Sequence, residues 1–256
     1  MNDVKQDGTL WEDLSTVPEL PPGTIHVWKL LLTNSRDASS RQILSEDEIK
    51  KAERFHFKDD RERFIETRST LRRLLSHYSG LNAAEIVFTY NVYGKPSFLG
   101  PNQTETLFFN ITHSKDIALF AFCRNEKVGV DIEYMGDTLE YLELAKRFFS
   151  KREYLVLAQL TDSELRRGFY RCWTRKEAFV KAVGKGLAFP FADFSVSLED
   201  DAKPQLNCVA HNKSFQGTCK MFPIQIDDSY YASLACLGES ERFVCYCCPQ
   251  NMDTLY

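Results

Sequence analysis

Two short segments carry acidic residues at spacings that could hold a metal ion beside a phosphate. Asp131 and Glu133 lie two residues apart at the end of the apolar run 128–130, and Glu177 and Lys181 lie four residues apart within residues 173–181. Side chains two apart on a strand point to one face, and side chains four apart on a helix share a face. We therefore predict a site with three carboxylates and one lysine.

The chemistry expected of this set is phosphoryl transfer. Two carboxylates on a partly buried strand face repel each other, and a divalent cation would relieve that repulsion. Oxygen ligands favour Mg²⁺, Mn²⁺ or Ca²⁺ over zinc, so we predict Asp131, Glu133 and Glu177 as metal ligands. Lys181 would neutralise a phosphate held by the same ion. The candidate catalytic residues are Glu177, Lys181 and Asp131.

Each segment also has an ordinary structural interpretation. Thr174 and Glu177 fit a helix capping box, and Glu177 with Lys181 fits a surface ion pair worth about 0.2–0.5 kcal/mol. The two acids at 131 and 133 fit the solvated end of an edge strand. These alternatives stay open for each segment alone, and it is their joint occurrence that favours a site.

Composition limits the class of protein. A chain of 256 residues with 43% hydrophobic residues can bury a full core, as one large domain or two small ones. The net charge of −4 and the pI near 5.8 argue against a dedicated nucleic-acid binder. The first residues lack the apolar core of a signal peptide, and no apolar run is long enough to span a membrane. We expect a cytoplasmic protein that binds neither membrane nor nucleic acid.

The eight cysteines indicate reduced thiols rather than a disulfide scaffold. Cys245 and Cys248 form one Cys-x-x-Cys pair, but no second pair accompanies them, and residues 243–247 fit a strand. A zinc site at this pair is not expected.

Hydrophobic periodicity predicts alternating helices and strands in two successive series. The predicted helices are one that opens with a capping box at residues 45–48, then 61–78, 141–149 and 163–183. The predicted strands are 25–32, 85–90, 107–112, 117–123, 128–133, 194–198, 220–226, 230–237 and 242–247.

The order of these elements indicates a duplication. Ala52-x-Arg54-Phe55 is echoed by Ala145-x-Arg147-Phe148, Thr67-Arg68 by Thr174-Arg175, and Gly94-Lys95 by Gly184-Lys185, in the same order. We predict an extension over residues 1–22 that is loosely held, α+β subdomains at 23–126 and 127–248, and a tail at 249–256. A ligand is expected in the cleft between two similar halves.

Several motifs resemble one enzyme family. The string Trp173-Thr-x-Lys176-Glu177-Ala-Phe-x-Lys181-x-x-Gly184-x-Gly186-Leu187, preceded by Gly129-Val-Asp131-Ile-Glu133, resembles the two signatures of surfactin-type (Sfp-type) 4′-phosphopantetheinyl transferases. Three further segments resemble other motifs of this family: Phe109-Asn110-Ile-Thr112-His113-Ser114, Tyr93-Gly94-Lys95-Pro96 and Arg147-Phe-Phe-Ser-Lys-x-Glu153-Tyr154. The resemblance covers residues 50–189 and implies an α+β fold of two similar subdomains about a pseudo-twofold axis, with the active site between them.

The resemblance also implies an activity and a set of binding residues. The family transfers the phosphopantetheine arm of coenzyme A to a serine of an acyl or peptidyl carrier protein, with Mg²⁺ or Mn²⁺ held by acids matching the three predicted ligands. By the same comparison Thr112 and His113 should contact a coenzyme A phosphate. The remaining residues predicted to bind coenzyme A are Lys51, Arg63, Gly94, Lys95, Pro96 and Lys181. A chain with two such halves is expected to act as a monomer.

Two departures and two alternatives accompany this hypothesis. Glu48 stands where the family often has another lysine, and Thr112 replaces a commoner serine. A non-catalytic coenzyme A binding module would keep the basic positions but would need no acid triad. A metal-dependent phosphodiesterase is the other alternative, against which the acidic pI and the absence of a basic stripe argue.

Overall fold

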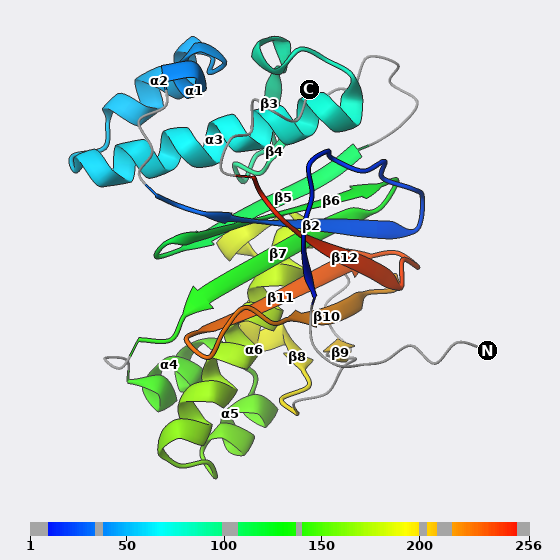
Figure 1. Cartoon of the computed structure of the whole chain (residues 1–256). Helices are drawn as coiled ribbons and strands as arrows, with labels where there is room; N and C mark the ends of the chain where they lie inside the picture. The colour runs from blue at the N-terminus through cyan, green and yellow to red at the C-terminus, as the bar shows by residue number, and fades with distance from the viewer. Residues whose placement is uncertain are drawn as a thin grey trace.

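Two β-sheets lie face to face in the middle of the molecule, and helices cover the outer face of each (Figure 1). The computed structural model describes residues 10–33, 38–98, 107–136, 140–199, 204–208 and 217–249. The layers in these ranges run in the order helix, sheet, sheet, helix. No helix in the same ranges has both the length and the apolar character needed to cross a bilayer.

The strands form two main sheets and two short hairpins. The larger sheet has the order β1 (Trp11–Asp13), β12 (Arg242–Cys247), β2 (Thr24–Leu31), β6 (Ile117–Arg124), β5 (Leu107–Ser114). The smaller sheet has the order β10 (Lys220–Ile224), β11 (Tyr230–Leu237), β7 (Lys127–Tyr134) and is antiparallel throughout. The hairpins pair β3 (Phe88–Tyr90) with β4 (Pro96–Phe98) and β8 (Phe194–Val196) with β9 (Leu206–Cys208).

Helices lie on both outer faces. The α-helices are α1 (Ala38–Gln42), α2 (Glu46–Glu53), α3 (Lys58–Ser79), α4 (Tyr141–Phe148), α5 (Lys151–Leu157) and α6 (Asp162–Val183). Short 3₁₀ turns occupy Ala83–Glu85, Gly186–Ala188 and Phe191–Asp193. The helix predicted at 163–183 is confirmed, whereas the separate helix α5 was not predicted.

Three apolar clusters fill the spaces between the layers. One lies between α3 and the larger sheet, where Leu71 and Leu75 meet Phe120. A second lies between the two sheets, where Leu119 of one sheet meets Val130 of the other. Burial of these side chains away from water provides the main force that holds the layers together.

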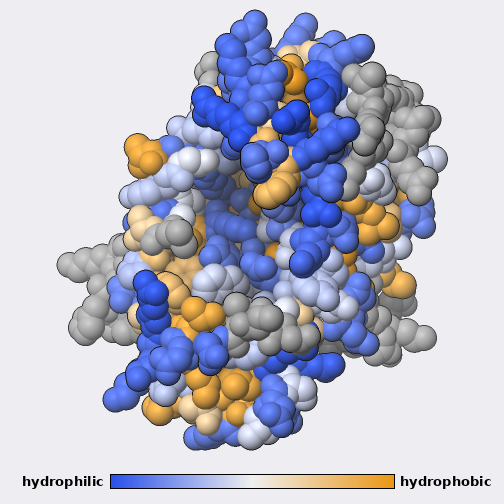
Figure 2. Space-filling model, turned by 90° about the vertical axis from the view of Figure 1, so that its left-hand side faces the viewer, coloured by the Kyte–Doolittle hydropathy of each residue, from blue (hydrophilic) through white to orange (hydrophobic). Residues whose placement is uncertain are grey.

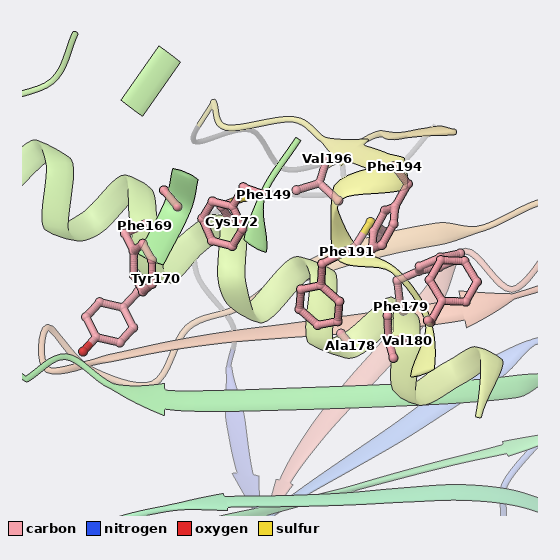
Figure 3. Packing of buried hydrophobic residues seen from close by; sticks show 14 of the residues in the cluster. Phe149, Phe169, Tyr170, Cys172, Ala178, Phe179, Val180, Phe191, Phe194 and Val196 are labelled. Atoms are coloured by element: carbon pink, nitrogen blue, oxygen red, sulfur yellow. The ribbon is translucent and has the colours of Figure 1, made fainter. Parts of the chain in front are cut away.

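The third cluster surrounds α6 (Figure 3). Phe169 of α6 packs against Phe149 with ring centroids 5.3 Å apart, and Phe179 packs against Phe194 at 4.9 Å. Phe149 and Phe194 come from segments before and after the helix, so α6 is enclosed along much of its length. This packing fixes the helix that carries Glu177 and Lys181.

The second half of the chain repeats the first. The strands β2, β6 and β5 are neighbours in that order, and β7, β11 and β10 repeat it. Helices α3 and α6 both have 22 residues and end at a left-handed glycine, Gly80 or Gly184. Glycine adopts this conformation without the steric penalty of a side chain, which explains both helix ends. The predicted pair of similar α+β subdomains is confirmed.

A buried ion pair lies at the same position in each half, and it shows which residues of the two repeats are equivalent. Glu48 closes the capping box of α2 and accepts a hydrogen bond from Arg72 Nε at 2.7 Å. Glu153 closes the capping box of α5 and pairs with Lys176 Nζ at 2.9 Å. Arg72 and Lys176 each stand eight residues before the glycine that ends their helix. The equivalent position in the two halves is therefore a buried acid that ties a short helix to a long one.

This structural alignment corrects the equivalences that we predicted from repeated sequence motifs. Thr67 and Thr174 lie 13 and 10 residues before the glycines that end their helices, so they occupy different positions. Gly94 lies between β3 and β4, whereas Gly184 ends α6. The match of short sequence motifs was therefore wrong about which residues are equivalent, because two-residue matches can fall at different positions of similar helices.

Residues 10–22 are more firmly held than predicted. The strand β1 pairs in parallel with β12, and Val17 and Leu20 are buried in the first apolar cluster. Strand β12, which we assigned to the second subdomain, joins the sheet of the first half beside β2. Pairing between such distant segments leaves no local signal in the sequence. Residues 1–9 and 250–256 lie outside the described ranges.

Strand β7 and helix α6 meet at Gly129. A Cβ atom on Gly129 would lie 2.1 Å from the carbonyl oxygen of Ala178 and 2.4 Å from the amide nitrogen of Ala182. Because alternate residues of a strand share a face, Asp131 and Glu133 face α6 together with Gly129. The missing side chain lets the strand and the helix approach closely enough to bring their functional residues together.

We predict that Gly129→Ala destabilises the protein by about 3 kcal/mol, because the added methyl group has only backbone atoms to displace. Unfolding in urea measures this change. Gly136→Ala is the matched control, since its Cβ would meet only the Tyr170 hydroxyl, at 3.7 Å. Equal stability of the two variants would contradict the close approach at Gly129.

Candidate active site

Asp131 and Lys181 form the centre of the predicted acid site. Asp131 is 3% exposed, and its Oδ1 accepts a hydrogen bond from Lys181 Nζ at 2.5 Å. Lys181 Nζ also donates to Thr112 Oγ1 at 3.0 Å, and Thr112 Oγ1 donates to the same carboxylate oxygen at 3.3 Å. These three side chains come from β7, α6 and β5, so the contact joins the two halves.

Side chains of β5 form hydrogen bonds with β7 where the two sheets meet. Asn110 Oδ1 accepts a hydrogen bond from the Val130 amide at 2.9 Å, and Ser114 Oγ accepts one from the Tyr134 amide at 2.9 Å. Asn110, Thr112 and Ser114 alternate along the strand and so share one face. Polar side chains thus satisfy the edge of β7, where a neighbouring strand would otherwise pair.

Burial places the acids under electrostatic strain. Burial, and then the charge of Asp131, raise the pKa of Glu133 to about 7. The same two causes raise the pKa of Glu177. Burial also raises the pKa of Asp131, although the Lys181 ammonium opposes the shift. Three carboxylates beside one lysine leave an excess of negative charge.

The residues present fit a divalent cation in donor type and charge. Asp131 Oδ2 is buried and has no hydrogen-bond partner, which is an unfavourable state for a carboxylate oxygen. A cation would satisfy this atom and balance the charge of Glu133 and Glu177, and oxygen ligands suit Mg²⁺ or Mn²⁺. The three carboxylates are not fully converged, since among the described residues the one triple of potential metal-binding groups with all donor atoms within 4.8 Å lies elsewhere.

The structure rules out the ordinary structural interpretations that the sequence left open for these segments. Thr174 lies in the interior of α6, with its hydroxyl 3.0 Å from that of Ser233, so Thr174 and Glu177 do not form a capping box. Lys181 pairs with Asp131 on another element instead of forming a surface pair along its own helix. Asp131 is buried rather than solvated.

A cavity of about 700 Å³ lies beside the acids, lined by residues of both halves. Figure 2 shows a hollow with hydrophilic walls at the height where the two halves meet. Lysine and arginine supply six lining residues, Lys51, Arg63, Arg68, Lys95, Lys115 and Lys181, against one acid, Asp60. Aromatic rings of Phe55, Phe64, Tyr90 and Tyr93 complete the lining. A basic cavity of this size with aromatic walls suits a nucleotide with several phosphates.

Seven of the eight residues predicted to bind coenzyme A line this cavity: Lys51, Arg63, Gly94, Lys95, Pro96, His113 and Lys181. The eighth, Thr112, is buried behind them and holds the ammonium group of Lys181. Desolvation, followed by the charges of Lys181 and Arg63, lowers the pKa of His113. The imidazole is therefore neutral at pH 7, where one ring nitrogen can donate a hydrogen bond to a phosphate.

The Lys95 side chain has a different environment from the one expected. Its ammonium group donates to three backbone carbonyls, those of Lys181 at 2.5 Å, Val128 at 3.3 Å and Ala182 at 3.4 Å. Asn91 Nδ2 donates to the Gly184 carbonyl at 2.7 Å. Both residues belong to the loop between β3 and β4, so the first half satisfies carbonyls at the C-terminus of α6. Lys95 therefore lines the cavity, while its ammonium group anchors the C-terminal end of α6.

The sequence interpretation missed part of the lining. Arg68 lies in the cavity wall, donates to the Tyr90 hydroxyl at 2.6 Å and pairs with Glu48. Arg68 was not among the residues predicted to bind coenzyme A, because the pairing of two buried residues 20 apart is not visible from spacing. Glu48, which stands where the family often has another lysine, is buried under Arg68 and Arg72 and does not line the cavity.

Comparison with known proteins gives a consistent picture for both halves. A profile described as the 4′-phosphopantetheinyl transferase superfamily matches residues 127–235, and one described as 4′-phosphopantetheinyl transferase, N-terminal, matches residues 33–125. The two matches adjoin at the turn between β6 and β7.

Individual relatives carry the same description. The chain is 40% identical over 167 residues to the 4′-phosphopantetheinyl transferase HetI of Nostoc sp., covering 64% of this chain and 70% of that protein. It is 35% identical over 189 residues to the 4′-phosphopantetheinyl transferase ffp of Bacillus subtilis, covering 73% of this chain and 80% of that protein. A crystal structure of a holo-(acyl-carrier-protein) synthase from Bacillus anthracis in complex with CoA (3′,5′-ADP) matches 43% of this chain and 94% of its own, with 24% identity and a TM-score of 0.37.

The raised pKa of Glu133 predicts a pH dependence of stability for the metal-free protein. Folding raises this pKa from 4.5 to about 7, so the folded state binds more protons between these values. The resulting stabilisation is full below about pH 4.5 and is lost as the pH rises through about 7. Unfolding in urea with a chelator present should show this decline, and Glu133→Gln should flatten it. Glu143→Gln, at an exposed position of α4, should leave the decline unchanged, and a decline in Glu133→Gln as steep as in the wild type would contradict the assignment.

Lys95 and Lys51 should behave differently when each is replaced by methionine. Lys95→Met should cost about 1.5–3 kcal/mol in the free energy of unfolding, because hydrogen bonds from a charged donor to three carbonyls are lost. Lys51→Met, at an exposed cavity residue, should change stability by less than about 0.5 kcal/mol but weaken coenzyme A binding. Chemical denaturation and titration calorimetry separate the two effects. A stable Lys95→Met variant that has lost only coenzyme A binding would return Lys95 to the role of a phosphate ligand.

Proposed function

This chain belongs to the 4′-phosphopantetheinyl transferase superfamily, and we propose that it transfers the 4′-phosphopantetheine group of coenzyme A to a serine hydroxyl of an acyl or peptidyl carrier protein. The observation that carries this proposal is the direct contact between the two parts of the site. Lys181 lines the basic cavity and at the same time pairs with the buried Asp131. A polyphosphate in the cavity would therefore reach the acid cluster.

The cavity provides charges for both phosphate groups of coenzyme A. Lys51 and Arg63 come from the helices of the first half and are assigned to the 3′-phosphate, whereas Lys181 and His113 are assigned to the pyrophosphate. Arg63 also pairs with Asp116 at 2.6 Å, so this guanidinium is already oriented at the rim. Tyr90 and Tyr93 supply aromatic faces that can stack on adenine.

Asp131, Glu133 and Glu177 are proposed to hold Mg²⁺, with Mn²⁺ as a substitute. Bound there, the ion would neutralise charge on the pyrophosphate oxygens. Asp131 would contribute the oxygen that has no hydrogen-bond partner, and Glu133 would have to release its proton because its pKa lies near 7. Binding of the ion should therefore tighten as the pH rises through neutrality.

The proposed reaction forms one bond and breaks one. The serine oxygen attacks the phosphorus that carries pantetheine, and the bond from this phosphorus to the bridging oxygen breaks, so that adenosine 3′,5′-bisphosphate leaves with the electron pair. Glu177 is proposed to accept the serine proton as general base, although binding of the ion would lower its basicity. Lys181 stabilises the charge that develops on the phosphates.

The carrier protein is proposed to dock beside α4, near residues 135–149. Tyr141 and Leu142 of this helix are half-buried, and Tyr141 packs on Phe169 and Tyr170. The exposed residues of α4 are charged, among them Lys146 and Arg147. Charged contacts are therefore expected to contribute more to docking than apolar ones. We further propose that the protein acts in the cytoplasm as a monomer.

The test is intact-mass measurement of apo carrier proteins incubated with the enzyme, coenzyme A and Mg²⁺. We expect a mass gain of one phosphopantetheine group that is lost when the metal is chelated. Glu177→Gln should slow the transfer about 100-fold or more while coenzyme A still binds. Glu85→Gln, at an exposed acid in the 3₁₀ turn Ala83–Glu85, is the matched control and should keep full activity.

The same experiment distinguishes the proposed transferase from a protein that only binds coenzyme A. Tight coenzyme A binding without modification of any of several carrier classes would favour a binding module. Transfer that is unaffected by Glu177→Gln and by Asp131→Asn would show that the acid cluster is not the catalytic site.

A further inference from the structure

Two cysteines and a glutamate converge at the junction of the two halves, away from the acid site. Cys123 lies at the end of β6, Glu126 in the turn that leads to β7, and Cys236 near the end of β11. One donor atom from each lies within 4.8 Å of the other two, and no other triple of cysteine, histidine or acidic groups in the described ranges meets this condition. Both cysteines are completely buried, whereas Glu126 is partly exposed.

The carboxylate of Glu126 is held in place by its surroundings. Its Oε1 accepts a hydrogen bond from the Glu239 amide at 3.0 Å, and its Oε2 accepts one from the Ser240 amide at 3.1 Å. A Cβ atom on Gly238 would lie 2.3 Å from this carboxyl group, so the loop has room for the carboxylate only because glycine stands there. Backbone donors that orient a carboxylate are typical of the groups behind a metal ligand.

The separations between the donor atoms are those of a small coordination sphere. Cys236 Sγ donates to Glu126 Oε2 at 3.0 Å, and Cys123 Sγ lies 3.8 Å from the Ser240 hydroxyl. With metal–sulfur bonds of about 2.3 Å, two thiolates on a tetrahedral ion are about 3.8 Å apart. An ion could therefore enter with small shifts of these side chains, replacing the thiol proton that now bridges Cys236 and Glu126.

We propose that Cys123, Cys236 and Glu126 form a second cation site, which binds a thiophilic divalent ion such as Zn²⁺ and is separate from the oxygen-only site at Asp131. Thiolates select Zn²⁺ over Mg²⁺, so the two sites would take different ions from one solution. Ser240 or a water molecule would complete a tetrahedron. Both thiols give up their protons to solvent when the ion binds.

The position of this site gives it a structural role. Cys123 belongs to the larger sheet and Cys236 to the smaller one, and Glu126 lies in the connection between them. An ion bound to all three would tie the two sheets together at the end of β7 opposite Glu133. The proposal does not depend on the transferase activity, because binding and stability report on it directly.

The test is titration of the full-length, reduced and chelator-treated protein with Co²⁺ in excess Mg²⁺, which occupies oxygen-only sites. We expect near-ultraviolet charge-transfer absorption from cobalt–thiolate bonds that saturates at one equivalent and disappears when Zn²⁺ is added. Cys123→Ser and Cys236→Ser should each weaken binding about tenfold or more. Cys245→Ser, at another buried cysteine, and Asp131→Asn should leave the signal unchanged.

A second measurement uses only the wild-type protein and so tests the proposal even if the serine variants fold poorly. In the wild-type protein, Zn²⁺ should slow alkylation of Cys123 and Cys236, read by peptide mass mapping, while Cys247 reacts at the same rate. The absence of charge-transfer absorption in the folded wild type would overturn the proposal. So would a signal that survives both serine substitutions or is lost in Cys245→Ser, since it would then arise from other thiols.

Discussion

The close packing of α6 on β7 at Gly129 is the constraint on which the site depends. No side chain separates the strand from the helix there, so Asp131 lies within hydrogen-bond distance of Lys181. The contact is maintained by the aromatic cluster around α6 on one side and by the apolar layer between the sheets on the other. Burial of Asp131 and partial burial of Glu133 and Glu177 are unfavourable, and the free energy of this packing offsets that cost.

The two halves are joined by side chains rather than by a continuous sheet. Asn110 and Ser114 accept hydrogen bonds from β7 amides that a neighbouring strand would otherwise accept, and Thr112 bonds the Asp131 carboxylate. Lys95 satisfies carbonyls at the end of α6. Because side chains rather than paired strands join the halves, there is room for a cavity between them. Direct strand pairing would fill that space. Asn110 and Lys95 therefore both line the cavity and join the two halves.

Much of the site could be predicted from the sequence because its signals are local. The spacing of two between Asp131 and Glu133 and of four between Glu177 and Lys181 identified the acids without knowledge of the fold. Pairings over long distances could not be predicted in this way. The Lys95 ammonium contacts carbonyls in residues 128–182, and the placement of β12 beside β2 joins segments more than 200 residues apart. Spacing identifies which residues share a face, but not which distant group that face will meet.

The placement of β12 has a consequence for how the chain reaches its folded state. This strand, which ends at residue 247, lies between β1 and β2, the two earliest strands described. During synthesis, one edge of β2 therefore lacks its partner strand until residue 247 has been made, and such edges favour aggregation. The sheet of the first half needs a strand from the second half to be complete. Folding of the larger sheet therefore depends on a contact between distant segments of the chain.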